Sequence, residues 1–183
     1  MRSLLFAALI ASSLATTACV RRNIPEPPTE RAGKVVVTKA GAPLLFSFES
    51  LDSRPFSSEA FANRYTVIAL CTTYDVASTV QSRVLGSLGR HHSPRINVAV
   101  LVLEPPENRP LVEAYAKSLG LTFPIAMSDR ATIAGQGPFA GLHHVPSIVI
   151  LDRRGREVWR QFGLADEAVL EAALKSVEGS SEP

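Results

Sequence analysis

The sequence is short of cysteine, of net charge and of long hydrophobic runs. Its 183 residues include two cysteines, Cys19 and Cys71, and carry a formal net charge of +2. So small a charge, with no basic run interleaved with aromatic residues, argues against nucleic acid as a partner. The longest N-terminal apolar run is too short for a membrane span. Hydrophobic residues make up 46% of the chain, which predicts one packed domain of ordinary size.

Residues 1–18 have the pattern of a secretory signal peptide. Arg2 supplies a positive charge, residues 4–10 are apolar, and small residues follow. The segment ends in Leu14-Ala15-Thr16-Thr17-Ala18-Cys19, which resembles a bacterial lipobox, although Thr16 stands where an aliphatic residue is usual. We therefore expect an exported protein of the cell envelope or periplasm, anchored to a membrane by a lipid on Cys19. Cleavage after Ala18 without lipidation is the alternative.

Residues 19–33 are predicted to be a tether. They contain Ile24-Pro25-Glu26-Pro27-Pro28, a polar and proline-rich run that favours an extended chain over a packed core. If Cys19 carries a lipid, Cys71 is the only thiol left and no internal disulfide can form. Without lipidation, a bridge between Cys19 and Cys71 is conceivable in an oxidising compartment.

The folded domain is expected over residues 34–178, with a tail over residues 179–183. Strands are predicted at residues 34–38, 44–56 (as a hairpin), 66–71, 96–103 and 123–127, and a second hairpin over residues 144–159. Helices are predicted at residues 57–61, from Asp75 to the polar break at residue 90, and at residues 110–119, 129–134 and 166–177. Strands separated by helices, followed by a hairpin, indicate an α/β fold with a central mixed β-sheet flanked by helices.

The stretch over residues 67–78 is the centre of this arrangement. A fully apolar strand passes through two threonines and Tyr74 into Asp75, a residue type that caps helix N-termini. Val76, Val80, Val84 and Leu88 then recur every four residues. This spacing predicts an apolar stripe by which the helix packs on the core.

This layout resembles the TlpA/ResA-like proteins, which are thioredoxin-like thiol-disulfide oxidoreductases of bacterial envelopes. In that family an aromatic-rich turn ending in Trp precedes a Cys-x-x-Cys that opens a helix. Here Tyr74 takes the place of the Trp, and Asp75-Val76-Ala77-Ser78 replaces the Cys-x-x-Cys. Val145-Pro146 matches the cis-proline of the family. The resemblance covers residues 42–177 and implies a thioredoxin-like fold.

Dithiol exchange is excluded at residues 75 and 78, because it needs one sulfur to attack and a second to resolve the mixed disulfide. Asp75 is expected to cap the helix. We therefore expect a non-catalytic binding or scaffold protein without a cofactor. The resemblance implies a binding surface made by Val145, Pro146 and Tyr74, where an extended peptide or an envelope protein would add as a strand.

Two other functions remain open from the sequence. Cys71 could act as a single thiol in a thiol-disulfide oxidoreductase or antioxidant protein, although a free cysteine at the end of an apolar strand is typical of a core residue. Cys71 together with His143 and His144 could bind copper or another soft metal. Both hypotheses depend on whether the Cys71 sulfur is accessible.

Overall fold

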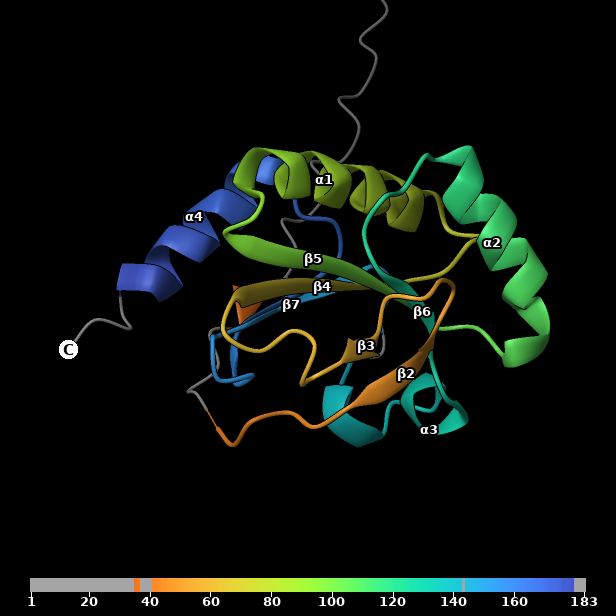
Figure 1. Ribbon diagram of the computed structural model, residues 1–183, viewed down its shortest axis with the longest axis horizontal. Coiled ribbons are helices and arrows are strands. Elements are labelled where there is room, and N and C mark those ends of the chain that lie inside the picture. Colours follow the sequence, from red (N-terminus) through yellow and green to blue (C-terminus); the bar gives the residue numbers. More distant parts are fainter. Residues whose placement is uncertain (1–34, 37–40, 143, 180–183) are drawn as a thin grey trace, which may run out of the picture. The chain divides into compact units, whose positions relative to one another are not determined.

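The computed structural model describes residues 35–36, 41–142 and 144–179. The predicted signal peptide, the predicted lipidation site at Cys19, the whole of the tether, His143 and residues 180–183 of the tail lie outside these residues. The described part folds around a sheet of eight strands in the order β1-β8-β7-β4-β5-β6-β2-β3 (Figure 1). The strands are β1 (Val35–Val36), β2 (Ser47–Ser50), β3 (Phe56–Ser57), β4 (Tyr65–Cys71), β5 (Ile96–Val102), β6 (Ile125–Met127), β7 (Ser147–Leu151) and β8 (Glu157–Phe162).

The sheet is mixed, as predicted. Strands β4, β5 and β6 are parallel, and β4 and β5 pair residue by residue from Tyr65 opposite Ile96 to Cys71 opposite Val102. Strand β7 runs antiparallel to both β4 and β8, and Gly155, with φ of +75°, lies in the turn that joins β7 to β8. Because β4 is central and covered on both faces, all seven of its residues are buried.

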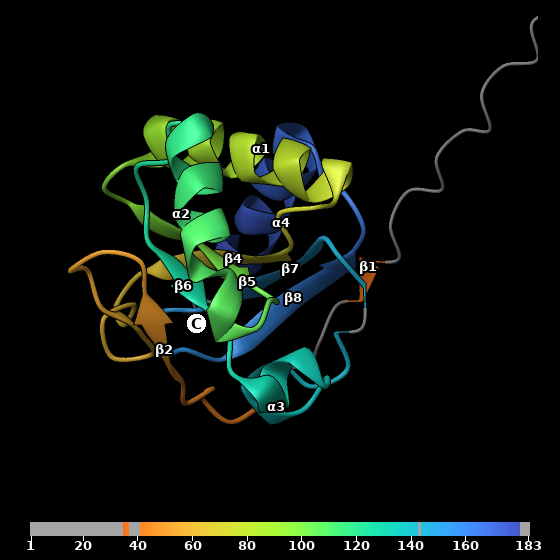
Figure 2. The ribbon, with the colours of Figure 1, turned by 90° about the vertical axis from the view of Figure 1, so that its right-hand side faces the viewer.

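The helices lie on both faces of the sheet. Helices α1 (Val76–His92), α2 (Arg109–Ser118) and α4 (Glu167–Gly179) lie on one side, and the short α3 (Arg130–Ile133) lies on the other (Figures 1 and 2). Under α1 and α4 the core is mainly aliphatic, with leucines from both helices over the β-branched residues of β4 and β5, and it includes Tyr65, Phe123 and Trp159. None of the helices in the described residues is long and apolar enough to cross a membrane.

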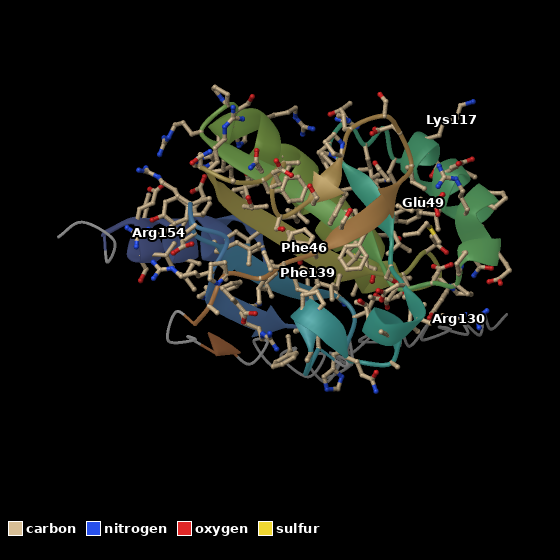
Figure 3. The ribbon with its side chains drawn as sticks, turned by 60° about the horizontal axis from the view of Figure 1, so that its bottom comes forward. Phe46, Glu49, Lys117, Arg130, Phe139 and Arg154 are labelled. Carbon is tan, nitrogen blue, oxygen red and sulfur yellow. The ribbon has the colours of Figure 1, made fainter. Side chains whose placement is uncertain are left out.

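The opposite face of the sheet is covered by an aromatic cluster. Phe46 lies 5.3 Å from Phe139 between ring centroids, and Phe56 lies 5.1 Å from Phe61 in an edge-to-face arrangement. Figure 3 shows Phe46 and Phe139 next to each other in front of the sheet. The cluster explains why the predicted helix at residues 57–61 is wrong. Phe56 and Ser57 pair with β2 instead, and a single turn then brings Phe61 into the cluster.

The predicted apolar stripe of α1 is wrong in its first half only, because Leu88 is buried and Val84 packs against the core as predicted. Val76 is 78% exposed and Val80 is 41% exposed, whereas the buried side chains of the helix are Ser78, Gln81, Ser82, Leu85 and Leu88. An α-helix turns by about 100° per residue, so a spacing of four drifts by about 40° at each step. Over the three steps from Leu88 back to Val76 the drift reaches about 120°, which carries Val80 and Val76 off the buried face.

Candidate binding site at the start of helix α1

Residues 72–75 form the turn between β4 and α1, and Asp75 ends it as the predicted cap. The Asp75 backbone is extended, and its Oδ2 accepts a hydrogen bond of 2.6 Å from the Ser78 N–H. A carboxylate at this position also interacts favourably with the positive end of the helix dipole. The Asp75 side chain is therefore engaged in holding the helix start.

Ser78 is fully buried and takes part in three further hydrogen bonds. Its hydroxyl oxygen accepts from the Thr72 N–H at 3.3 Å, which fastens the turn to the helix. Its carbonyl oxygen accepts from the Ser82 hydroxyl at 2.9 Å and from the Tyr115 hydroxyl at 3.3 Å. Asp75 and Ser78 thus hold the turn and the first turn of α1 in place.

Cys71 lies beneath this turn with no exposed surface. Burial in apolar surroundings raises the pKa of its thiol to about 12, and its nearest polar contact is the Ser82 hydroxyl, 4.0 Å from Sγ. Since the thiolate is the reactive form, a thiol with so high a pKa is almost entirely protonated at neutral pH. This environment is that of a core residue and disfavours the single-thiol hypothesis.

Glu104 is a buried residue of this site that the sequence reasoning missed. One carboxylate oxygen accepts from both the Thr73 N–H, at 2.6 Å, and the Thr73 hydroxyl, at 2.7 Å, and the other accepts from Asn108 Nδ2 at 2.9 Å. The β4–β5 register pairs residues 31 apart, as in Cys71 with Val102. Extended by two residues, it places Thr73 opposite Glu104. Pairing the two predicted parallel strands would therefore have revealed the contact.

Tyr74 and Val76 flank Asp75 and both point into solvent. Tyr74 is 76% exposed and Val76 is 78% exposed, and Val80 continues the apolar surface one turn further along α1. Large apolar side chains gathered on one part of a surface indicate an interaction site more often than scattered ones do. We call Tyr74, Val76 and Val80 the α1 apolar patch.

The Val145-Pro146 peptide bond is cis, as predicted from the family resemblance. The Pro146 carbonyl accepts from the Gly163 N–H at 2.8 Å, and the Ser147 hydroxyl donates to the His144 carbonyl. The ladder between β7 and β4 ends where Ser147 pairs with Leu70. Continued by two residues, this antiparallel register leads from Val145 to Thr72, so the loop approaches the turn before α1. Within the described residues the Val145 main chain makes no hydrogen bond.

The residues considered for a metal are not gathered by the described part of the chain. His144 is exposed and its ring packs edge-on to Phe162 at 5.9 Å, while Cys71 is sealed in the core. Across residues 35–36, 41–142 and 144–179 there is no group of three or more His, Cys, Asp or Glu side chains placed to hold a metal ion. His143 lies outside these ranges, so the hypothesis that includes it stays a prediction.

Comparison with known proteins identifies the fold. No family model and no curated protein matches the sequence. Among solved structures, a DsbF homologue from Corynebacterium diphtheriae superposes with a TM-score of 0.68 at 15% identity, over 82% of this chain and 96% of that one. A secreted thiol-disulfide isomerase from Corynebacterium glutamicum superposes with a TM-score of 0.66 at 16% identity, over 83% of this chain and 95% of that one. StoA from Bacillus subtilis superposes with a TM-score of 0.60 at 16% identity, over 72% of this chain and 96% of that one. The predicted thioredoxin-like fold is thereby confirmed.

Proposed function

We propose that this chain is an exported thioredoxin-fold protein of the cell envelope that binds a partner protein and does not perform dithiol exchange. The observation that carries the proposal is the α1 apolar patch, which is exposed beside a turn that has Asp75 and Ser78 where the TlpA/ResA-like proteins have two cysteines. Asp75 and Ser78 hold the helix start, whereas Tyr74 and Val76 have no packing role that explains their apolar side chains. Structural neighbours described as a secreted isomerase and a DsbF homologue support export and descent from a redox fold.

The partner is proposed to bind as an extended segment. The free N–H and C=O of Val145 would pair with the main chain of such a segment, as in other cases of strand addition. Tyr74 and Val76 would contact its side chains from the neighbouring turn. Glu104 would keep that turn in one conformation through its two hydrogen bonds to Thr73.

Site-specific photo-crosslinking in envelopes tests this binding. Tyr74→p-benzoylphenylalanine should give discrete cross-linked products, and a second change, Val76→Asp, should abolish them because it places a charge in the apolar contact. The matched control is Val169→p-benzoylphenylalanine, which lies on α4 and is 38% exposed. The proposal fails if position 74 gives no product, or if positions 74 and 169 give the same products.

Insulin reduction tests the absence of dithiol exchange. The wild type should show no turnover, whereas Asp75→Cys combined with Ser78→Cys should form a disulfide and gain activity, because a helix N-terminus lowers the pKa of the first thiol. Wild-type turnover would overturn the proposal. The burial of Ser78 beside the half-buried Asp75 suits a pair in which one sulfur is accessible and the other resolves.

Anchoring through Cys19 is the remaining part of the proposal. The acyl chains added to a lipobox cysteine hold a protein on a membrane, so Cys19→Ala should release it into the soluble fraction. The measurement is sedimentation of envelopes, together with the intact mass of the purified protein. An unmodified mass for the wild type, with the same membrane association in both proteins, would contradict the anchor.

A further inference from the structure

A pocket separate from the α1 apolar patch lies further along the same helix. It has a volume of about 320 Å³ and lies between the middle of α1 and the segment that joins α2 to β6. Its lining includes Arg83, Gly86 and Arg90 from α1, with Leu119 and Phe123 from the connecting segment. Arg83 is three residues beyond Val80, the last residue of the patch, and Gly86 is six residues beyond it, which corresponds to about 9 Å along a helix axis. The pocket therefore adjoins the surface proposed to bind a partner but shares no residue with it.

The spacing on α1 brings two guanidinium groups to this pocket. Arg83 and Arg90 are seven residues apart and so lie on the same face of the helix, with Gly86 between them. An ideal Cβ placed on Gly86 would lie 3.5 Å from Arg90 Nη1 and 3.6 Å from Phe123 Cε1. The Arg90 side chain thus reaches back over Gly86 toward Arg83, and the glycine leaves the space between Arg90 and the Phe123 ring open.

Neither arginine has a partner within the described residues, in contrast to most of the arginines there. Arg54, Arg109, Arg156 and Arg160, for example, each pair with a carboxylate. Arg54 also donates to the Thr122 carbonyl at the rim of the pocket, and Asp52 neutralises its charge. Two uncompensated guanidinium groups at one hollow create a local positive potential that attracts an anion.

We propose that this pocket binds a small organic phosphate, with its phosphoryl group between Arg83 and Arg90 and its organic part against Phe123. Two guanidinium forks offer more N–H donors than the two oxygens of a carboxylate accept well, whereas a phosphate monoester presents three oxygens. The volume lies in the range of ligand pockets and exceeds the needs of inorganic phosphate alone. This activity goes beyond the proposed partner binding and does not depend on it.

Phenyl phosphate is the probe for the test. The full chain is titrated with it, and isothermal titration calorimetry measures the dissociation constant. Arg83→Gln and Arg90→Gln should each weaken binding about tenfold or more, since each removes charge-assisted hydrogen bonds. Arg154→Gln is the matched control, because it removes the same charge from an exposed arginine that lies far from α2 in Figure 3 and should change affinity less than twofold. Gly86→Leu should abolish binding by filling the space, while circular dichroism shows an intact fold.

The outcomes separate the proposal from general attraction to positive charge. It is overturned if the wild type does not bind millimolar phenyl phosphate, if Arg154→Gln weakens binding as much as Arg83→Gln, or if Gly86→Leu binds normally. Benzoate binding as tight as that of phenyl phosphate would overturn the preference for phosphate. Vesicles of phosphatidylglycerol, compared with phosphatidylcholine, distinguish the source of the phosphate when every protein carries Cys19→Ala, because the proposed lipid anchor would otherwise bind both kinds of vesicle. Sedimentation lost in Arg83→Gln and Arg90→Gln indicates a lipid headgroup, and phenyl phosphate binding without it indicates a soluble ester.

Discussion

Helix α1 buries hydroxyl and amide side chains over its first two turns and leucines over the next two. On the buried side, Ser78, Gln81 and Ser82 precede Leu85 and Leu88. On the exposed side, Val76 and Val80 occupy the same first two turns. The start of the helix thus has its polar side inward and its apolar side outward, the reverse of an ordinary amphipathic helix.

Each of the buried polar side chains makes at least one hydrogen bond, although Gln81 Nε2 has no partner among the described residues. Gln81 Oε1 accepts from the Ala165 N–H at 2.8 Å, which ties α1 to the segment before α4. The Ser82 hydroxyl donates to the Ser78 carbonyl and lies 2.9 Å from the Tyr115 hydroxyl of α2. Hydrogen bonds therefore hold the first two turns of α1, and apolar packing holds its last two turns.

The largest effect is expected from Gln81→Ala, which tests the buried side. The change leaves the buried Ala165 N–H without a partner and opens a cavity, so the free energy of unfolding should fall by about 2–4 kcal/mol. Val80→Ala is the matched control on the exposed side and should change it by less than about 0.5 kcal/mol. Urea denaturation measures both. Equal losses would mean that the two faces do not differ in energetic importance.

A second test compares two glycines of α1. A Cβ on Gly89 would lie 2.7 Å from Cγ2 of Val98, a stiff side chain of β5, whereas a Cβ on Gly86 meets only ordinary contacts of 3.5 Å or more. Gly89→Ala should therefore destabilise the protein by about 1–3 kcal/mol through overpacking. Gly86→Ala should stabilise it by about 0.5–1 kcal/mol through helix propensity. The midpoint temperatures of thermal unfolding of the two variants should shift in opposite directions from that of the wild type. A shift in the same direction for both would contradict the geometry.

Cys71 provides a pH-dependent test of the buried side. Burial raises the pKa of this thiol from 9.0 to about 12 in the folded state. Between these pH values the unfolded chain loses the thiol proton and the folded chain keeps it. The contribution of this thiol to the free energy of unfolding is therefore fully present below pH 9 and is lost as the pH rises. From pH 7 to pH 10 the wild type should lose on the order of 1 kcal/mol more than Cys71→Ala does. Urea denaturation under reducing conditions measures this difference, and parallel losses would show that the thiol is accessible.

Much of the fold was predictable, because it depends on patterns that are local in the sequence. The apolar runs of β4 and β5 and the capping residues Asp75 and Asp129 gave element positions that agree with the structure. The turn at residues 57–61 was not predictable in this way. Its conformation is fixed by contacts of Phe56 and Phe61 with an aromatic cluster drawn from distant parts of the chain.

The site was predictable in its outline and not in its contacts. The turn at residues 72–75 and the cis-proline loop were expected, whereas the role of Glu104 depends on pairing two strands that are separated by a helix. The pocket at Gly86 requires knowing where the α2–β6 segment passes over α1. Periodicity also failed at Val76, because a helix start that is held by hydrogen bonds does not need its apolar residues in the core.

The smallest effect on stability is expected at Val76, and that is what makes the position informative. Its side chain is 78% exposed, so Val76→Ser removes little buried apolar surface and should change the free energy of unfolding by less than about 0.5 kcal/mol. If the α1 apolar patch serves binding, the same change should nevertheless reduce cross-linking from position 74 several-fold, because serine removes apolar contact with the partner. Val169→Ser on α4, where the valine is 38% exposed, should leave cross-linking from position 74 unchanged. A large loss of stability in Val76→Ser would mean that the residue packs within this chain, and the patch would lose its assigned role.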